Sequence, residues 1–134
     1  MTYRLPPQVA SKIENWLQTR TGKLVDVQNP TPDMVDLEDI AHALSMTCRY
    51  AGHCCEFYSV AEHSVLVATL GHRHDLAPEF NLALLMHDAA EAYIGDIISP
   101  VKRLLAPGSN ELENRWLAAI EKKFDLEDRL TNMG

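Results

Sequence analysis

Residues 59–96 read SVAEHSVLVATLGHRHDLAPEFNLALLMHDAAEAYIGD, which is typical of two helices joined by a polar turn. The first four residues, Ser59 to Glu62, form a capping box, in which the serine and the glutamate satisfy free backbone N–H groups at the start of a helix. We therefore expect a helix from this box to Gly71. Pro78 suits the first position of a second helix, which we expect to continue to about Tyr93.

Hydrophobic spacing and helix-start residues extend the helical pattern outward from this stretch. Asp36 is expected to cap a helix whose apolar residues recur every three or four positions. We expect further helices over about residues 7–20, 36–44, 100–105 and 109–123, an extended segment with one short strand over 23–34, and an irregular segment or a short hairpin within 47–58. The sequence thus predicts an all-α fold, a compact helical bundle formed as one domain over residues 1–134.

The composition excludes several classes of protein. The 134 residues carry 12 Lys and Arg against 19 Asp and Glu, so the net charge of −7 argues against binding to a nucleic-acid polymer. Neither a transmembrane run of about 20 apolar residues nor the apolar core of a signal peptide is present in the sequence, so we expect no association with a membrane. The three cysteines are a poor disulfide framework, which favours a reducing cytoplasm, and we expect Cys54 and Cys55 to be buried thiols rather than zinc ligands.

Ionisable side chains lie on the apolar stripes of the two central helices. We expect His63 on the inward stripe of the first helix, and His87, Asp88 and Glu91 on the inward stripe of the second. The apolar members of these two stripes are Leu66, Val67, Leu70, Phe80 and Leu84. Antiparallel packing would bring both stripes together as a divalent metal site, because imidazole and carboxylate ligands suit Zn, Co, Mn or Fe.

A metal-free interpretation stands beside this one. A single histidine on an apolar helix face is more often a packed core residue, and the whole domain could be a plain helical core without a metal. The three neighbouring ionisable groups favour the metal, because burying them without a cation or strong partners is expensive. A second His-Asp sequence at residues 72–75 falls in the polar turn, so we interpret it as a solvated loop.

The spacing of these residues resembles that of the HD-domain phosphohydrolases. The resemblance is carried by His63, by His87-Asp88 with Glu91, and by Gly95-Asp96 continuing to Pro100-Val101-Lys102. Residues 59–64 and 87–96 are similar to the bacterial 5′-deoxynucleotidase branch. Residues 40–45 and 48–53 resemble short HD proteins of phages and bacteria, a group that includes triphosphohydrolases acting on dATP. The resemblance covers roughly residues 36–123 and implies a helical HD domain around one or two divalent metals.

The resemblance also implies roles for individual residues. By that match, His63, His87 and Asp88 are metal ligands, and Glu91 acts with Asp88 in catalysis by handling the proton of the attacking water. Arg49 matches an arginine that holds phosphate. The family pattern ends with a further downstream aspartate, for which Asp125 and Asp128 are the candidates after Phe124. The alternatives are water, Asp96, a neighbouring subunit or a naturally truncated chain.

Other substrate-binding roles leave structural alternatives open. Asp96 matches a position that contacts the sugar in the deoxynucleotidases, or it caps the next turn. His53 and Lys102 are placed to reach phosphate, although His53, like His42, could be a packed histidine and Lys102 could balance a helix C-terminus. Arg49 could instead form a surface ion pair.

These residues predict a metal-dependent phosphohydrolase that removes the phosphate of a nucleotide substrate by metal-activated water, with a deoxynucleoside 5′-monophosphate as the expected substrate. The alternatives are a deoxynucleoside triphosphate triphosphohydrolase and a non-catalytic nucleotide-binding HD module that lacks the closing ligand. A homo-oligomer is a further expectation, with Trp16, Trp116 and Leu117 as interface or core residues.

Overall fold

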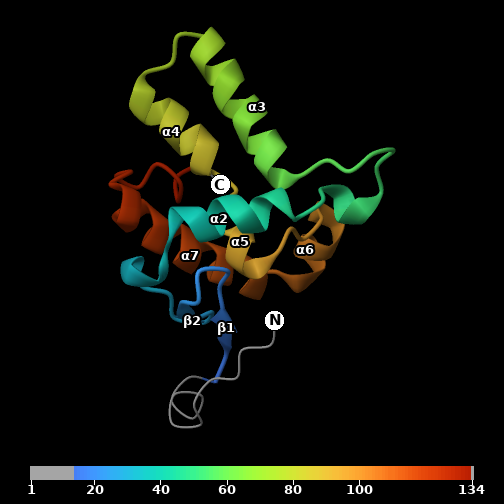
Figure 1. Cartoon of the computed structure of the whole chain (residues 1–134), viewed down its shortest axis with the longest axis vertical. Coiled ribbons are helices and arrows are strands. Elements are labelled where there is room, and N and C mark those ends of the chain that lie inside the picture. The colour runs from blue at the N-terminus through green and yellow to red at the C-terminus, as the bar shows by residue number, and fades with distance from the viewer. Residues whose placement is uncertain (1–13, 134) are drawn as a thin grey trace.

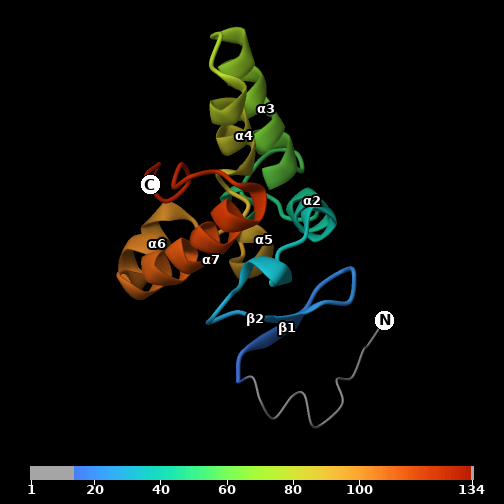
Figure 2. The same ribbon diagram turned by 90° about the vertical axis from the view of Figure 1, so that its left-hand side faces the viewer.

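The computed structural model describes residues 14–133, and this part of the chain is mostly helical with one short two-stranded hairpin. Figures 1 and 2 show a pair of helices, α3 and α4, standing out from a body that the remaining helices and the hairpin form. The elements in chain order are β1 (Trp16–Gln18), β2 (Leu24–Asp26), the 3₁₀ turn η1 (Pro32–Met34), α2 (Leu37–Ser45), the 3₁₀ turn η2 (Tyr50–Gly52), α3 (Val60–Arg73), α4 (Pro78–Met86), α5 (Glu91–Ile94), α6 (Ser99–Leu105) and α7 (Gly108–Phe124).

The strand pairing lies at the start of the described chain. β1 and β2 pair antiparallel, with Leu17 opposite Val25. The expected helix over residues 7–20 is therefore wrong from residue 14 onward, and its first part, residues 7–13, lies outside the described residues. Tertiary contacts override the helical spacing here: Val25 is fully buried, and the buried carboxylate of Asp39 accepts hydrogen bonds from the backbone N and Oγ1 of Thr21. The single short strand expected within 23–34 is confirmed.

The two helix starts expected from side-chain caps are confirmed. The carboxylate of Asp36 accepts from the backbone N of Glu38 and Asp39 at the start of α2. Ser59 Oγ accepts from Glu62 N at 3.0 Å at the start of α3, which extends to Arg73. These caps satisfy N–H groups that a helix leaves free, so both starts could be read locally from the sequence.

The second central helix is not continuous, which corrects the expected helix over 78–93. α4 ends at Met86, a tight turn follows, and α5 begins at Glu91. The backbone bonds across this turn reach back three residues, as in Ala89 N to Met86 O at 3.0 Å and Glu91 N to Asp88 O at 3.0 Å. Bonds of this kind are typical of 3₁₀ geometry, which winds the chain more tightly than an α-helix.

The segment 47–58 forms a loop rather than a hairpin. An isolated bridge between Cys48 and Ser59 closes its base, and η2 lies within it. Residues 50–52 all have positive φ (59°, 53° and 81°), which prevents a regular strand there. Cys48 and Cys54 are half-buried, whereas Cys55 is exposed and is not the buried thiol we expected.

One buried apolar cluster joins the body of the molecule. Trp116 of α7 is fully buried, stacks on Tyr93 at a centroid distance of 4.0 Å, and donates from Nε1 to Val27 O at 2.9 Å. Trp116 and Leu117 are thus core residues, whereas Trp16 is 39% exposed. The cluster consists of Val25, Val35, Ile40, Leu44, Val60, Ala83, Met86, Ala89, Ala90, Tyr93, Trp116, Leu117, Ala119, Ile120, Leu126 and Leu130.

The projecting pair α3 and α4 packs closely along its own length but leaves apolar side chains outside. A Cβ on Gly71 would lie 2.5 Å from Asn81 Oδ1 and 2.6 Å from Leu84 Cδ1, so the two helices approach each other closely at this glycine. Leu66, Leu70 and Phe80 are exposed, so the expected inward stripes are wrong at these positions. Within the described residues, no helix is both long and apolar enough to cross a membrane.

Candidate metal centre

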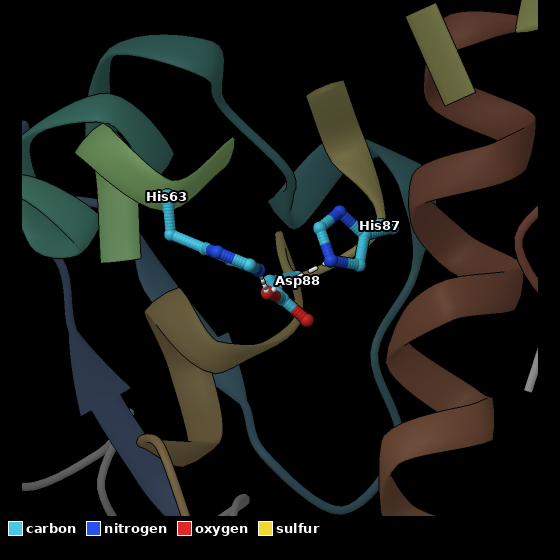
Figure 3. A group of neighbouring side chains, drawn as sticks. All are labelled: His63, His87 and Asp88. Atoms are coloured by element: carbon cyan, nitrogen blue, oxygen red, sulfur yellow. Dashed lines mark ion pairs between the residues drawn. The ribbon is translucent and has the colours of Figure 1, made fainter. Parts of the chain in front are cut away.

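His63, His87 and Asp88 meet where the projecting helices join the body of the molecule. One ligand atom from each side chain lies within 4.8 Å of the ligand atoms of the other two. Asp88 Oδ2 is 3.5 Å from His63 Nε2 and 3.0 Å from His87 Nε2, and Figure 3 shows the carboxylate between the two imidazole rings. These three residues are the ligands expected from the sequence, and the structure brings them together.

The backbone explains why adjacent residues on one chain can face the same point. In a straight α-helix, consecutive side chains point about 100° apart. Here the His87 side chain bonds through Nδ1 to Leu84 O at 2.6 Å, the carbonyl that Asp88 N would use in a continuous helix. The resulting tight turn lets the side chains of His87 and Asp88 meet, while His63 reaches them from the first turns of α3.

The cluster is electrostatically coupled. The hydrogen bond to Asp88 raises the pKa of His87, against the opposing effect of burial. Burial alone would raise the pKa of Asp88, but the hydrogen bond and charge of His87, with the charges of His63 and Arg49, hold it below its usual value. In the metal-free chain, the carboxylate is therefore stabilised by a neighbouring imidazolium.

Arg49 contacts the cluster from the loop before α3. Its Nη1 lies 3.0 Å from His63 Nδ1, and because a guanidinium only donates, Nδ1 is the acceptor and the proton of neutral His63 is on Nε2. Burial lowers the pKa of His63, and the charge of Arg49 lowers it further. The guanidinium also lies over the rings of Tyr50, at 4.7 Å, and Tyr58, at 5.6 Å.

Two further carboxyls lie close to the cluster. Burial raises the pKa of Glu91 to about 8, and the charges of Asp88 and Asp96 contribute to the shift. Burial, followed by the charge of Asp88, also raises the pKa of Asp96. Glu91 lines a narrow cavity together with Gly95, Lys102 and Glu113. Its carboxyl is therefore placed to hold a proton beside the three candidate ligands.

The other candidate binding residues are distributed differently. Lys102 forms an ion pair with Glu113 in the wall of the Glu91 cavity, so its ammonium group already has a partner. His53 is exposed at the end of η2. His42 is exposed on α2 and lines a separate pocket with Arg20 and Asp39.

Neither downstream aspartate joins the cluster. Asp125 and Asp128 are exposed and line a pocket at the end of α7, and the possible ligand group found among the described residues consists of His63, His87 and Asp88 alone. His74, in the second His-Asp sequence, is exposed at the end of α3, as expected for a solvated position.

The donor set of the cluster fits a first-row divalent cation. Two imidazole nitrogens and one carboxylate oxygen suit Zn, Co, Mn or Fe, whereas Ca or Mg prefers oxygen ligands alone. His87 Nδ1 is held by the backbone carbonyl of Leu84, the outer contact that metal-binding histidines usually make. His63, His87 and Asp88 are therefore the residues that could hold a metal.

Two neighbours of the site were missed in the sequence. Glu113 lies on α7, 22 positions after Glu91, and nothing in its helical spacing distinguishes it from the other charged residues of that helix. Tyr58 comes to Arg49 because the loop between them closes, as shown by the 2.8 Å bond from Arg49 N to Tyr58 O. Both contacts depend on tertiary structure.

No family model matches the chain. The chain is 40% identical over 115 residues to an uncharacterized protein of Rhodobacter capsulatus, an alignment that covers 83% of this chain and 59% of that protein. It is 41% identical over 112 residues to the uncharacterized protein YfdR of Escherichia coli K12, covering 84% of this chain and 60% of YfdR. The chain thus spans about three-fifths of the length of these curated relatives, whose names state no activity.

Proposed function

We propose that the chain is a metal-dependent phosphohydrolase of the HD-domain type that removes the phosphate of a deoxynucleoside 5′-monophosphate. The observation that carries the proposal is the convergence of His63, His87 and Asp88, with Arg49 in contact with His63. The similarity of residues 59–64 and 87–96 to the bacterial 5′-deoxynucleotidases supports the choice of substrate.

His63, His87 and Asp88 would hold a divalent Zn, Co, Mn or Fe ion. Such an ion, when bound, supplies Lewis acidity for a phosphoryl oxygen and makes water more acidic. Asp88 contributes one negative charge to the site and keeps it at neutral pH, because the pKa of its carboxyl is lowered. His87 must lose a proton before its Nε2 can act as a ligand, so we expect tighter metal binding as the pH rises.

Arg49 supplies the group that binds the phosphate. Its guanidinium offers parallel N–H donors, which match two phosphate oxygens and neutralise part of their charge. The rings of Tyr50 and Tyr58 hold the guanidinium beside the cluster. Binding of a phosphate at this point would replace the contact between Arg49 and His63.

Glu91 is the proton acceptor in this proposal. In the metal-free chain its carboxyl holds a proton at pH 7, because its pKa is about 8. Added positive charge at the cluster lowers the pKa of a nearby carboxyl, so the carboxylate form becomes available when the site is loaded. Glu91 then accepts a proton from the attacking water, and Asp96 contacts the sugar, which is the role that the resemblance implies for it.

The test is product analysis with the metal-loaded protein. The chain is incubated with Mn, Co, Zn or Fe and with deoxynucleoside monophosphates and triphosphates, and orthophosphate and triphosphate are measured separately. We expect orthophosphate from a monophosphate, a loss of at least ~100-fold in Glu91→Gln, and no change in the surface variant His74→Ala. Release of triphosphate would instead indicate a triphosphohydrolase, and nucleotide-induced stabilisation without either product would indicate a binding module.

We further propose that the protein acts in the cytoplasm, since three cysteines, two of them adjacent, suit a reducing compartment. That the chain forms a homo-oligomer stays a prediction. Light scattering at several protein concentrations measures the molar mass in solution and so tests it.

A further inference from the structure

Two of the three cysteines lie against each other in the loop that carries Arg49. Cys48 Sγ and Cys54 Sγ are 3.5 Å apart, although five residues separate them in the sequence. Both side chains are half-buried, while Cys55 beside them is exposed. The proposed phosphohydrolase uses none of these thiols, so the pair has no role in the function described above.

The fold of the loop explains how the two thiols meet. The base of the loop is closed by the bond from Arg49 N to Tyr58 O at 2.8 Å and by the bond from Val60 N to Thr47 O at 2.9 Å. Between the cysteines, the chain reverses through η2, where Tyr50 and Ala51 both have positive φ. Non-glycine residues rarely adopt this conformation, so the turn is held by its surroundings, and the contact between the cysteines joins its two ends.

We propose that Cys48 and Cys54 are a site of reversible oxidation, where a peroxide converts the two thiols into a disulfide that fixes the Arg49–Gly52 turn. A disulfide needs a sulfur–sulfur distance of about 2.05 Å, so the two sulfurs must approach each other by about 1.5 Å when the bond forms. This proposal is independent of the proposed phosphohydrolase activity.

The reaction removes two electrons and two protons from the pair. Cys48 loses its proton, and the thiolate attacks one oxygen of hydrogen peroxide. The O–O bond breaks to give a sulfenic acid and hydroxide, and the hydroxide takes up the proton that Cys48 lost and becomes the first water. The Cys54 sulfur then attacks the Cys48 sulfur, the S–O bond breaks, and the hydroxyl leaves with the Cys54 proton as a second water. The contact between the two sulfurs places Cys54 next to the sulfenic acid that forms on Cys48, so the second step needs no rearrangement of the chain.

The disulfide would act on the loop next to the candidate metal centre. Arg49 directly follows Cys48, and its Nη1 lies 3.0 Å from His63 Nδ1. The hydrogen bonds from Gly52 N to Arg49 O and from His53 N to Tyr50 O lie inside the turn that the disulfide would close. We expect these two amides to exchange with solvent at least ~10-fold more slowly after oxidation, because opening the turn would require breaking a covalent link.

The test uses peptide mapping of the full chain. Trypsin cuts after Arg49, so Cys48 and Cys54 fall on different peptides, residues 24–49 and 50–73, and a disulfide joins them. The variants Cys55→Ser and Cys54→Ser each leave Cys48 with one partner on the second peptide. Each variant is treated with dilute hydrogen peroxide, and its monomer is isolated and digested. The Cys55→Ser monomer should give the disulfide-joined peptides in at least ~10-fold higher yield than the Cys54→Ser monomer, and a reductant should separate the joined peptides.

Equal yields from the two variants, or joined peptides only in chains linked to a second copy, would overturn the proposal. So would unchanged exchange of the Gly52 and His53 amides in oxidised Cys55→Ser, because the disulfide would then not hold the turn. Cys55 is exposed, so its replacement by serine is compatible with the fold and leaves the native pair intact.

Discussion

Asp88 is the residue on which the geometry of the candidate metal centre depends. Its Oδ2 faces both imidazoles, and the charges around it keep it ionised. The two histidines differ in their outer contacts: a carbonyl accepts from His87, whereas a guanidinium donates to His63. Metal binding at His63 must therefore disturb its contact with Arg49, because an Nδ1 that carries a proton or binds a metal cannot accept from an arginine.

At this scale, we expect Asp88→Asn to weaken metal binding by at least ~100-fold, because the amide removes the only negative charge among the three ligands. Isothermal titration of the metal-free protein with Mn or Zn measures the change. His74→Ala is the matched control, since it removes an exposed histidine of the other His-Asp sequence. Equal affinities for Asp88→Asn and the unmodified protein would place the metal elsewhere.

Glu91 should make the stability of the metal-free chain depend on pH. Its pKa is about 8 in the folded chain against an ordinary 4.5, so between these values the folded chain holds more protons than the unfolded chain. Stability from this group is therefore fully present below pH 4.5 and is lost as the pH rises through 8. We expect the free energy of unfolding to fall by roughly 2 kcal/mol from this cause between pH 5 and 8, with partial solvation considered.

Urea unfolding of the metal-free protein and of Glu91→Gln, each at about pH 5 and about pH 8, isolates the contribution of Glu91 to the free energy of unfolding. The variant lacks the titrating carboxyl, so its stability relative to the unmodified protein should rise with pH. Parallel pH profiles for the two proteins would show that Glu91 does not titrate abnormally.

The break between α4 and α5 is the element that turns a sequence motif into a site. Hydrophobic spacing indicates one helix through this region, and the structure has two, with a tight turn across residues 87–90. The His87 side chain uses the carbonyl of Leu84 and so competes with the backbone of the helix. Helix propensity does not include such a side-chain bond, so the break cannot be predicted from hydrophobic spacing.

The contact between α3 and α4 depends on the absence of a side chain at Gly71. Alanine usually stabilises a helix relative to glycine, but a Cβ at position 71 would meet Asn81 and Leu84 at about 2.5 Å. Both atoms are ends of side chains that can move aside, so we expect Gly71→Ala to lower the free energy of unfolding by about 1 kcal/mol at most. Gly108→Ala, with nothing within 4 Å of its Cβ, should be neutral or stabilising by a few tenths of a kcal/mol.

Chemical denaturation of the two glycine variants compares them directly. If Gly71→Ala proved more stable than Gly108→Ala, the close approach of α3 and α4 at Gly71 would not contribute to the free energy of unfolding.

At the scale of the molecule, α7 links segments far apart in the sequence. Trp116 bonds to Val27 O, 89 positions earlier, and stacks on Tyr93 next to the end of α5. The same helix carries Glu113, which pairs with Lys102 in the cavity beside Glu91. The hairpin, the candidate centre and the last long helix therefore share one packing unit.

We expect Trp116→Phe to lower the free energy of unfolding by about 2 kcal/mol, because the partly buried carbonyl of Val27 loses its donor and the smaller ring leaves space in the core. Trp16→Phe, at a partly exposed strand position, should change it by less than about 0.5 kcal/mol. Equilibrium unfolding followed by circular dichroism tests both variants. Equal losses in the free energy of unfolding would contradict the burial of Trp116 and the partial exposure of Trp16.

Local signals account for what could be predicted from the chain alone. The caps at Asp36 and Ser59 and the helices near Pro100 and α7 could be located because each depends on residues only a few positions apart. The identity of His63, His87 and Asp88 as a group was also predictable, because their chemical type and spacing stand out.

The features that could not be predicted from the sequence depend on packing between segments far apart in the chain. Residues 16–18 form a strand by pairing with residues 24–26, and the turn between the strands bonds to Asp39 of α2. At the turn over 87–90, the His87 side chain competes with the backbone for the carbonyl of Leu84. The contacts of Arg49 with His63, of Lys102 with Glu113 and of Cys48 with Cys54 all depend on how loops and helices close in space. Spacing along the sequence shows which side chains are available, but the free energy of packing selects which of them meet.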